Sequence, residues 1–286
     1  MKKVILLFVA LSFIICGFAQ EEEKKKDKPV RSPFNSGYLI DNQTTYVAYP
    51  KTLGMYIQHK FGTIENGTED IWGIYKSANV RIALDYVVRE NLQVGWGLTR
   101  SGMVHDFNVK YTILEQTRKN TIPVALAVYG NMGISQMGEE SFGADYAFTD
   151  RMSYFGQVMV SRKFNDRITL QAAGSFSHFN QVDTASYSFD RLGVHVLGRV
   201  KVTETGSFLF SYDQPLKALA LSPHADKAVM PNISFGWEIA TVSHQFQLFM
   251  GYSEEILPQY FMNRAAEELE FGMFRIGFTM TRMWNF

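Results

Sequence analysis

The sequence predicts an all-β protein, a closed antiparallel up-and-down transmembrane β-barrel of about twelve strands. Three observations predict it: short segments alternate apolar with polar side chains, short connections alternate with longer ones, and the chain ends in an aromatic-rich strand. After the first 19 residues no segment approaches about 18 consecutive apolar residues, which excludes membrane-spanning helices. We therefore expect a barrel domain at residues 44–286, with long extracellular loops and short periplasmic turns.

Residues 1–19 have the features of a secretory signal peptide. Lys2 and Lys3 precede an apolar run at 4–15, and Gly17 and Ala19 supply the small residues that a signal peptidase needs. The run is too short to cross about 30 Å of hydrocarbon, which argues against a transmembrane anchor. The charged stretch that follows cannot bury apolar surface, so we expect a flexible tail over residues 20–43. The sequence thus predicts export, cleavage of the signal and location in the outer membrane.

Composition argues against several classes of function. The chain has 28 basic and 28 acidic side chains, and a nearly neutral protein lacks the field that gathers nucleic acid. The single cysteine, Cys16, lies in the signal, so the mature chain has no disulfide, thiolate metal site or cysteine nucleophile. The sequence shows no metal-ligand spacing, P-loop or dinucleotide fingerprint, so no cofactor is expected.

Each expected strand has one apolar face and one polar or small face, as Val80, Ile82, Leu84 and Tyr86 illustrate. Successive strand side chains point to opposite faces, so this period of two is typical of a strand. Strands are expected at 44–61, 78–88, 91–100, 105–114, 121–134, 150–164, 167–180, 190–202, 206–213, 231–241, 243–253 and 270–286. The longer links are 62–77, 135–149, 181–189, 214–230 and 254–269, and only 101–104 breaks the rhythm by being short.

A soluble periplasmic β-sandwich that binds a ligand would also show alternation, because its strands bury one face in a core. Two features favour the membrane barrel. The minor face is rich in Gly, Ser, Thr, Gln and charged residues while large aromatics occupy the other face, and the short and long links alternate. An even strand number places both ends of the barrel on the periplasmic side.

The polar face would point into the lumen. Nine ionisable residues are expected there: Arg81, Asp85, Lys110, His195, Arg199, Lys201, Asp213, Glu238 and Arg275. They carry both charge signs, which suits a self-paired polar network as well as a selective path for a solute. Both interpretations stay open at this point. The link at 257–269 could form a short helix that acts as a lid, a plug or a packed loop.

The final strand carries the most specific signal. Its aromatic and apolar face is expected to be read by the barrel assembly machinery, through Phe278, Met280, Trp284 and Phe286. Arg282 interrupts this face, and near the interface an arginine can extend its head group to lipid headgroups. His59 and His244 are expected to cap the apolar band at opposite interfaces.

Catalytic chemistry finds little support. His105 and Asp106 are sequence neighbours, and so are Ser177 and His178, but adjacent strand residues point to opposite faces. Asn180 lies on the face of His178 and could orient it. A hydrolase needs Ser, His and a third group within about 3 Å of one another, and no nucleophile motif places them so. The sequence therefore predicts that the protein is not an enzyme, with a membrane-embedded hydrolase that depends on His178 as an alternative.

Several short motifs carry a resemblance to a known family: His59-Lys60-Phe61-Gly62, Leu84-Asp85-Tyr86, Gln93-Val94-Gly95 with Arg100, Lys110-Tyr111 with Gln116, Arg162-Lys163-Phe164, His178-Phe179-Asn180, His244-Gln245-Phe246-Gln247-Leu248 and Gly277-Phe278-Thr279-Met280-Thr281-Arg282. From about residue 40 to 286 the chain resembles a Bacteroidota family described as a membrane-bound β-barrel domain of unknown function. It departs at Lys60, where an arginine is usual, and at Thr279, where we expect asparagine. The resemblance implies fold and compartment only. Asp183-Thr184-Ala185 also matches, weakly, an O-glycosylation acceptor of exported Bacteroidota proteins, although a simple loop explains it as well.

The function that these observations favour is an integral outer-membrane barrel that serves as a narrow small-solute channel or as a structural scaffold for an envelope complex. Its expected partners are outer-membrane lipid and, through the last strand, the assembly machinery.

Overall fold

The computed structural model describes residues 27–30, 33–182, 188–216, 229–264 and 269–286. The expected signal peptide with Cys16, the first part of the charged tail and Thr184 lie outside the described residues. Within the described ranges, no helix has the length and apolarity needed to cross a membrane.

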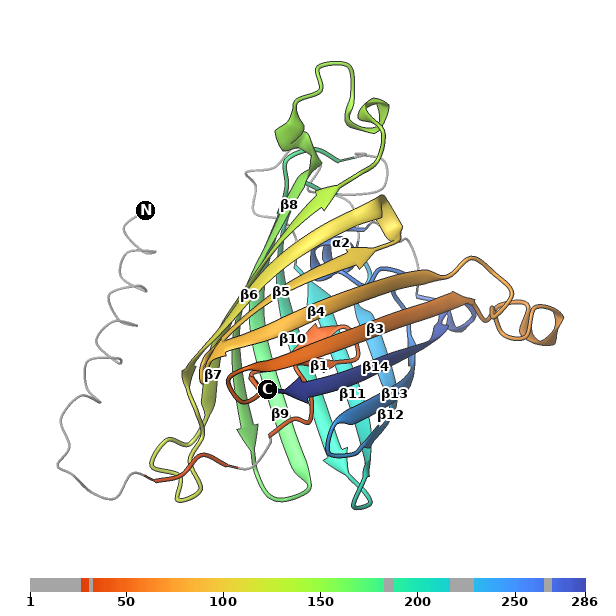
Figure 1. Cartoon of the computed structure of the whole chain (residues 1–286). Helices are drawn as coiled ribbons and strands as arrows, with labels where there is room; N and C mark the ends of the chain where they lie inside the picture. The colour runs from red at the N-terminus through yellow and green to blue at the C-terminus, as the bar shows by residue number, and fades with distance from the viewer. Residues whose placement is uncertain (1–26, 31–32, 183–187, 217–228, 265–268) are drawn as a thin grey trace.

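Twelve antiparallel strands, β3 to β14, form one closed barrel (Figure 1). The strands are β3 (Thr52–Thr63), β4 (Asn79–Arg89), β5 (Leu92–Thr99), β6 (Val104–Leu114), β7 (Ala125–Ser135), β8 (Met152–Lys163), β9 (Ile168–Phe179), β10 (Asp190–Lys201), β11 (Gly206–Pro215), β12 (Asn232–Ala240), β13 (His244–Gly251) and β14 (Arg275–Asn285). The remaining elements are β1 (Tyr38–Leu39), β2 (Asn42–Gln43), α2 (Pro258–Asn263) and five short 3-10 helices, η1 (Gly67–Glu69), η2 (Ser101–Met103), η3 (Glu139–Phe142), η4 (Phe148–Arg151) and η5 (Phe271–Met273).

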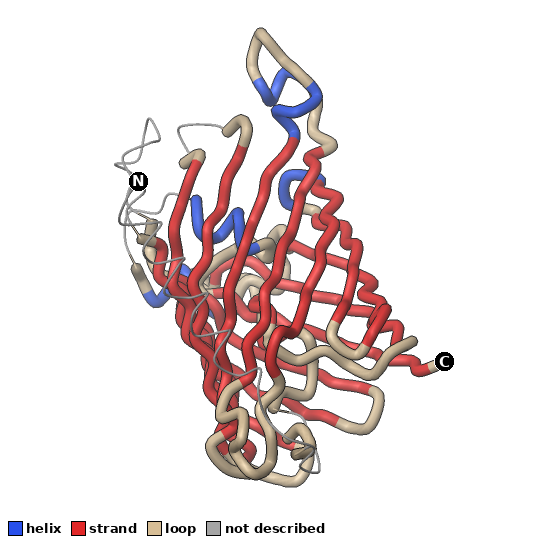
Figure 2. Tube along the Cα trace, turned by 90° about the vertical axis from the view of Figure 1, so that its left-hand side faces the viewer, coloured by secondary structure: helices blue, strands red, loops and turns tan. Residues whose placement is uncertain are grey.

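The seam between β14 and β3 closes the sheet. It pairs from Arg275 opposite Thr63 to Asn285 opposite Thr52, with one irregularity between Arg275 and Gly277. Closure leaves neither strand with an unpaired edge, which is the condition for a sheet in hydrocarbon. The strands run side by side around one ring (Figure 2), so the fold is a single closed sheet and not two stacked sheets.

The two faces of the sheet differ as the alternation predicts. On β4, Ile82, Leu84 and Tyr86 are exposed on the outside, whereas Arg81 and Asp85 are each only 2% exposed on the inside. The outer face is therefore apolar and the lumen polar. A one-residue slip in register would exchange these faces, so the pattern fixes the register of each strand.

The connections lie at two ends of the barrel. We call the end with links 90–91, 115–124, 164–167, 202–205 and 241–243 the turn end, and the end with links 64–78, 100–103, 136–151, 180–189, 216–231 and 252–274 the loop end. The link 115–124 is longer than expected, because β7 begins at Ala125 and not at residue 121. Pro123 has no backbone N–H to donate to a ladder, which explains the later start.

The largest difference from the expected organisation concerns residues 34–51. The flexible tail was expected to reach residue 43 and the first strand to start at 44, but β3 begins at Thr52. Residues 34–45 instead form a hairpin, built on β1 and β2, that lies inside the barrel with Phe34, Leu39 and Ile40 at most 2% exposed. We call it the lumen hairpin. The expectation was wrong for residues 34–43 because an argument from the charged residues 21–28 was extended into a segment that buries apolar and amide side chains.

Candidate functional site in the barrel lumen

The lumen hairpin is anchored by a buried ion pair at its turn. Asp41 Oδ2 lies 2.6 Å from Lys60 Nζ of β3, and each side chain is 1% exposed. Lys60 Nζ also donates to the carbonyls of Ser253 and Glu255, at 2.9 and 2.7 Å. All of these partners are oxygen atoms, as a buried ammonium requires.

The turn itself has an unusual backbone. Ile40 has a φ of 57°, a left-handed conformation that is a genuine outlier for a β-branched residue. Its N–H donates to Gln247 Oε1 at 2.7 Å, and its carbonyl accepts from Gln58 Nε2 at 3.3 Å and from Thr279 Oγ1 at 3.4 Å. The wall therefore holds the turn in a conformation that the free peptide would disfavour.

The hairpin also contacts the wall on its other sides. Its side chains and backbone reach β6 through Gln43 and Lys110 (3.0 Å), β8 through Thr45 and Ser161 (2.5 Å), β9 through Thr45 and Gln171 (2.9 Å), β11 through Asn42 and Ser211 (2.9 Å), and β12 through Asn35 and Glu238 (2.7 Å). An apolar cluster adds to these contacts where Phe34, Leu39 and Ile40 pack with Leu197, Leu209 and Phe249 of the wall. The hairpin thus fills the middle of the lumen and contacts the wall all around it.

The ionisable residues that the sequence assigned to the lumen are placed as follows. Seven are buried inside the barrel: Arg81, Asp85, Lys110, His195, Arg199, Asp213 and Glu238. The other two are partly exposed at opposite ends, Lys201 beside Glu204 (3.0 Å) near the turn end and Arg275 bonded to the carbonyl of Tyr252 (2.7 Å) near the loop end.

Several of the buried wall charges pair with one another, and others bond to side-chain amides. Arg81 makes a bidentate pair with Asp106, at 2.9 and 2.7 Å, and Arg199 Nε lies 3.0 Å from Glu238. Asp85 accepts from the side-chain amide of Gln93 at 2.9 Å. Of the two interpretations left open by the sequence, this conformation shows the self-paired network.

A second arrangement joins three neighbouring strands. Ser175 Oγ of β9 lies 2.7 Å from His195 Nε2 of β10, and His195 Nδ1 lies 2.8 Å from Asp213 Oδ1 of β11. The three residues are 8%, 1% and 0% exposed. Sequence reasoning placed His195 and Asp213 in the lumen but missed Ser175. Only the register, which sets His195 opposite Asp213 and Ser175 opposite Gly193, brings the three together.

Helix α2 lies toward the loop end of the barrel (Figure 1), in contact with β9, β10 and β11, the three strands that carry this cluster. It contacts β8, β9, β10 and β11, and Phe261 and Met262 pack with Tyr129, Phe155 and Met159 of the wall. Gln259 and Asn263, on the same helix, donate to Asn131 Oδ1 at 2.9 Å and to Ser177 Oγ at 2.6 Å. The helix lies within the range 257–269, where a short helix was one of the possibilities that the sequence left open, and it occupies the mouth.

The histidine that the sequence weighed as catalytic lies elsewhere. His178 Nδ1 is 2.7 Å from Asp190 Oδ1 and its Nε2 is 3.0 Å from Asn180 Oδ1, so both ring nitrogens face amide or carboxylate oxygens. Ser177 bonds inside the lumen to Asn263 and to the carbonyl of Arg191. The two neighbours therefore do face opposite sides of the sheet, and this His178 contacts no hydroxyl among its described partners. Asp106, the neighbour of His105, pairs with Arg81 instead.

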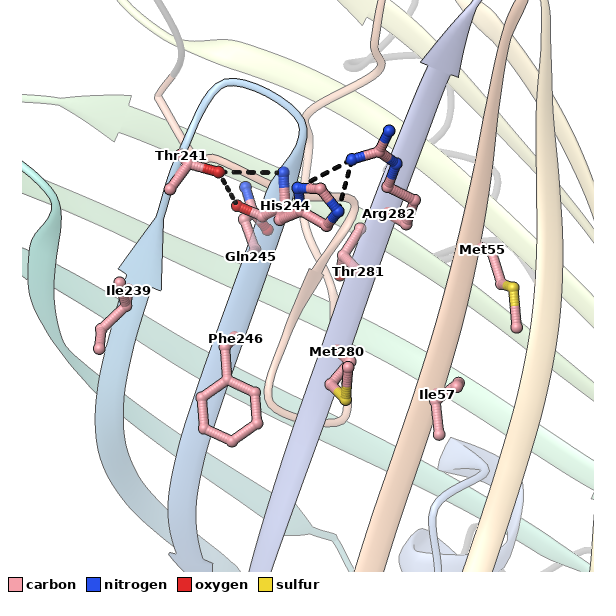
Figure 3. Close-up of a pocket in the computed structure, with 10 residues that line it drawn as sticks. All are labelled: Met55, Ile57, Ile239, Thr241, His244, Gln245, Phe246, Met280, Thr281 and Arg282. Carbon is pink, nitrogen blue, oxygen red and sulfur yellow. Dashed lines mark hydrogen bonds between the residues drawn. The ribbon is translucent and has the colours of Figure 1, made fainter.

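The outer surface has a groove near the turn end (Figure 3). Its volume is about 280 Å³, and apolar side chains of Ile57, Phe246 and Met280 form most of its wall. Arg282 and His244 stand at its rim in contact with each other. His59 stacks on Phe278 at 5.0 Å, farther toward the loop end of the same outer face. Among the described residues, no group of three or more His, Cys, Asp or Glu gathers in a way that would hold a metal ion.

These features define a membrane-bound β-barrel whose lumen is filled by its own chain. The chain belongs to the family described as "Membrane bound beta barrel domain (DUF5777)", which matches residues 34–284 and so includes the lumen hairpin. No characterised protein with a curated description matches the sequence.

Solved structures to which the chain is similar include a channel and two porins, by title. One is the COG4313 outer membrane channel from Pseudomonas putida F1, with a TM-score of 0.51, 12% identity, and coverage of 84% of this chain and 97% of that one. The KdgM porin follows at a TM-score of 0.46 and 4% identity, covering 82% and 99%. The NanC porin has a TM-score of 0.47 and 6% identity, covering 81% and 98%. At these identities the likeness concerns the fold alone.

Proposed function

We propose that the protein is an outer-membrane channel for small solutes, closed in this conformation by the lumen hairpin. The observation that carries the proposal is topological. Both legs of the hairpin leave the barrel at the turn end: Pro29 bridges to Thr117 in the link 115–124, and Lys51 N–H donates to the carbonyl of Val87 near the end of β4. The hairpin can therefore withdraw without breaking a single pairing between barrel strands.

The chemistry of the wall supports the same function. The polar side chains of a wall that loses the hairpin can exchange their hydrogen bonds for bonds to water, whereas the apolar contacts with Leu197, Leu209 and Phe249 would be lost without replacement. Below the hairpin, a cavity of about 790 Å³ opens at the turn end, with Tyr46, Glu115 and Arg118 in its lining. The two legs of the hairpin form part of its lining, so a solute in this cavity would lie beside them.

The strained turn at Ile40 also favours a segment that moves. A non-glycine residue held at positive φ costs of order 1–3 kcal/mol, and that energy is returned when the turn leaves its wall partners. A scaffold with no moving part gains nothing from such a turn. The scaffold function stays as the second proposal, because the paired charges of the wall also suit a permanently closed barrel.

Location and partners belong to the same proposal. By the outer-membrane pattern the turn end faces the periplasm and the loop end the outside, after cleavage of residues 1–19. The assembly machinery reads the final strand, where Phe286 is 77% exposed and free to be bound. Lipid occupies the groove of Figure 3, where Arg282 and His244 can meet a headgroup phosphate above apolar acyl contacts.

A disulfide across the hairpin tests the channel. The mature chain lacks cysteine, and Thr45 Oγ1 lies 2.5 Å from Ser161 Oγ, so Thr45→Cys with Ser161→Cys can bridge the hairpin to β8. In planar bilayers we expect discrete current steps from the reduced variant, none from the oxidised one, and their return after dithiothreitol. Each single-cysteine variant, insensitive to the reductant, is the control.

Deletion of residues 34–45 completes the test. The deleted barrel, shown to be folded by its fast migration before heating, should conduct continuously. If neither the reduced double variant nor the deletion variant conducts, the channel proposal is wrong and the scaffold proposal remains.

A further inference from the structure

Ser175, His195 and Asp213 form a hydrogen-bonded series whose order is that of a serine nucleophile, its base and the residue that orients the base. The two distances, 2.7 and 2.8 Å, are within the range of strong hydrogen bonds. The residues come from adjacent strands, which hold each side chain on a rigid element.

Asp213 sets the tautomer of His195. Its second oxygen, Oδ2, accepts from Asn232 Nδ2 at 2.8 Å, Asn42 Nδ2 at 3.1 Å and Ser211 Oγ at 3.4 Å, so the carboxylate is surrounded by donors. An acceptor on Nδ1 requires a proton there, which leaves the lone pair of the neutral imidazole on Nε2. That lone pair faces the hydroxyl of Ser175, which must donate to it.

The comparison with His178 shows that this order is not a general feature of the barrel. Both nitrogens of His178 lie beside oxygens of Asp190 and Asn180, so neither nitrogen is bonded to a hydroxyl in the part of the chain that the structure describes. His195 has a carboxylate on one side and a hydroxyl on the other. His178 therefore has a structural role, whereas His195 has the hydrogen-bond partners of a general base.

The space beside Ser175 is apolar and shaped by Gly193. A Cβ on Gly193 would lie 2.8 Å from Ser175 Oγ and would clash with the methyl group of Met262. The methyl group of Met262 therefore lies beside Gly193 on the side of the hydroxyl, and Met262 packs with Phe261, Phe155 and Met159. An outward movement of α2 would vacate the volume of the Met262 side chain next to Ser175.

Strand β8, the other neighbour of β9, carries a hydrogen-bond donor for the oxyanion that forms when a serine attacks a carbonyl group. Gln157 of β8 is directly opposite Ser175 in the register, and it is 4% exposed on the same lumen face. Opposite residues of an antiparallel pair have Cβ atoms about 5 Å apart. The carboxamide N–H of Gln157 is thus within reach of the oxyanion of a tetrahedral intermediate formed on Ser175 Oγ.

We infer that Ser175 is a nucleophile for acyl transfer, with His195 as its general base, and that the substrate is a carboxylic ester with a short apolar acyl group that enters from the loop end. Ser175 Oγ attacks the carbonyl carbon while its proton passes to His195 Nε2, and Gln157 donates to the oxyanion. Collapse breaks the ester C–O bond, and the leaving alcohol takes the proton from His195. Water then attacks the acyl-serine with His195 again as base, which releases the carboxylic acid and restores Ser175.

The experiment uses the folded full-length barrel in detergent and an alkyl fluorophosphonate, with which a nucleophilic serine forms an O–P bond while fluoride leaves. We expect one adduct, mapped to Ser175 by mass spectrometry, together with hydrolysis of p-nitrophenyl butyrate. Ser175→Ala and His195→Ala should lose both. Ser234→Ala, which removes another fully buried lumen serine, should keep both.

Two more variants make the result decisive. Met262→Ala opens space beside the hydroxyl, so its Ser175 should be labelled faster than that of the wild type. Gln157→Leu should still fold, but its labelling and its ester hydrolysis should be slower. If neither the wild type nor Met262→Ala is labelled while both are folded, the inference is overturned and the three residues form a structural network. Labelling of any serine other than Ser175 would overturn it as well.

Discussion

The lumen hairpin and α2 fill the barrel from opposite ends, and they do so in different ways. The hairpin contacts strands around the whole wall, from β3 and β6 to β12 and β14, and its turn carries the Asp41–Lys60 ion pair. Helix α2 contacts the neighbouring strands β7 to β11, through the apolar side chains of Phe261 and Met262 and through the amides of Gln259 and Asn263.

This difference separates two roles that a filled lumen can have. A segment that bonds to most strands contributes to the stability of the entire barrel, so its removal changes every part of the lumen. A helix of six residues on one side can open alone, because it shares few contacts with the rest. The hairpin is therefore the part of the chain that fills the middle of the lumen, and α2 is a local cover over Ser175.

The largest effect should come from the buried ion pair. Lys60→Met leaves Asp41 buried without its cation, which we expect to lower the free energy of unfolding by about 3–5 kcal/mol. Urea unfolding in lipid vesicles measures it. Lys76→Met, which removes a solvent-exposed pair with Glu65, is the matched control and should leave unfolding unchanged. Equal losses of unfolding free energy in the two variants would show that the ion pair of the hairpin does not stabilise the barrel more than an exposed pair does.

Apolar truncations should distinguish the two segments directly. Leu39→Ala in the hairpin should reduce global stability by about 2–5 kcal/mol. Phe261→Ala in α2 removes a side chain of equal burial, but the loss should appear as faster amide exchange within 258–263, with the strands still protected. A global loss of stability from Phe261→Ala would show that α2 is not an independent cover.

A smaller, kinetic effect is expected at the end of the chain. Phe286 is 77% exposed in the folded barrel, so Phe286→Ala should not change the unfolding of the purified protein. If the assembly machinery binds this residue, the variant should accumulate more slowly in the outer membrane of growing cells. Normal accumulation would mean that Phe278, Met280 and Trp284 suffice for recognition.

The smallest effect should be confined to the loop that joins β3 and β4. A hydrogen bond from Lys76 lowers the pKa of Glu65, and the backbone N–H of Gly73 lowers the pKa of Asp70. Both carboxylates therefore stabilise the loop at any pH above their ordinary pKa values. This stabilisation is lost as the pH falls through the lowered pKa values of the folded loop. Fluorescence of Trp72 should change below about pH 4 without unfolding of the barrel. Glu65→Gln should weaken this dependence.

The sequence predicted the barrel well because the lipid and the lumen impose opposite polarity on alternate residues, as Arg81 and Ile82 show. Strand ends were accurate where a turn or polar residue follows directly, as at Lys201 and Gly206. The hairpin was missed because two strands of two residues leave no periodic pattern, and because its partners are as distant in sequence as Gln247. The pairing of Ser175 with His195 depends on the register between neighbouring strands, which a motif of consecutive residues does not contain.

In the orientation proposed above, both legs of the hairpin lie on the periplasmic side and give the closed barrel a direction. Phages, antibodies and antibiotics outside the cell would then meet the loop end and α2, on the side opposite the hairpin legs. A periplasmic protein that grips the chain before Phe34 would hold the only handle, and permeability of the outer membrane through this barrel would then be decided from within the envelope.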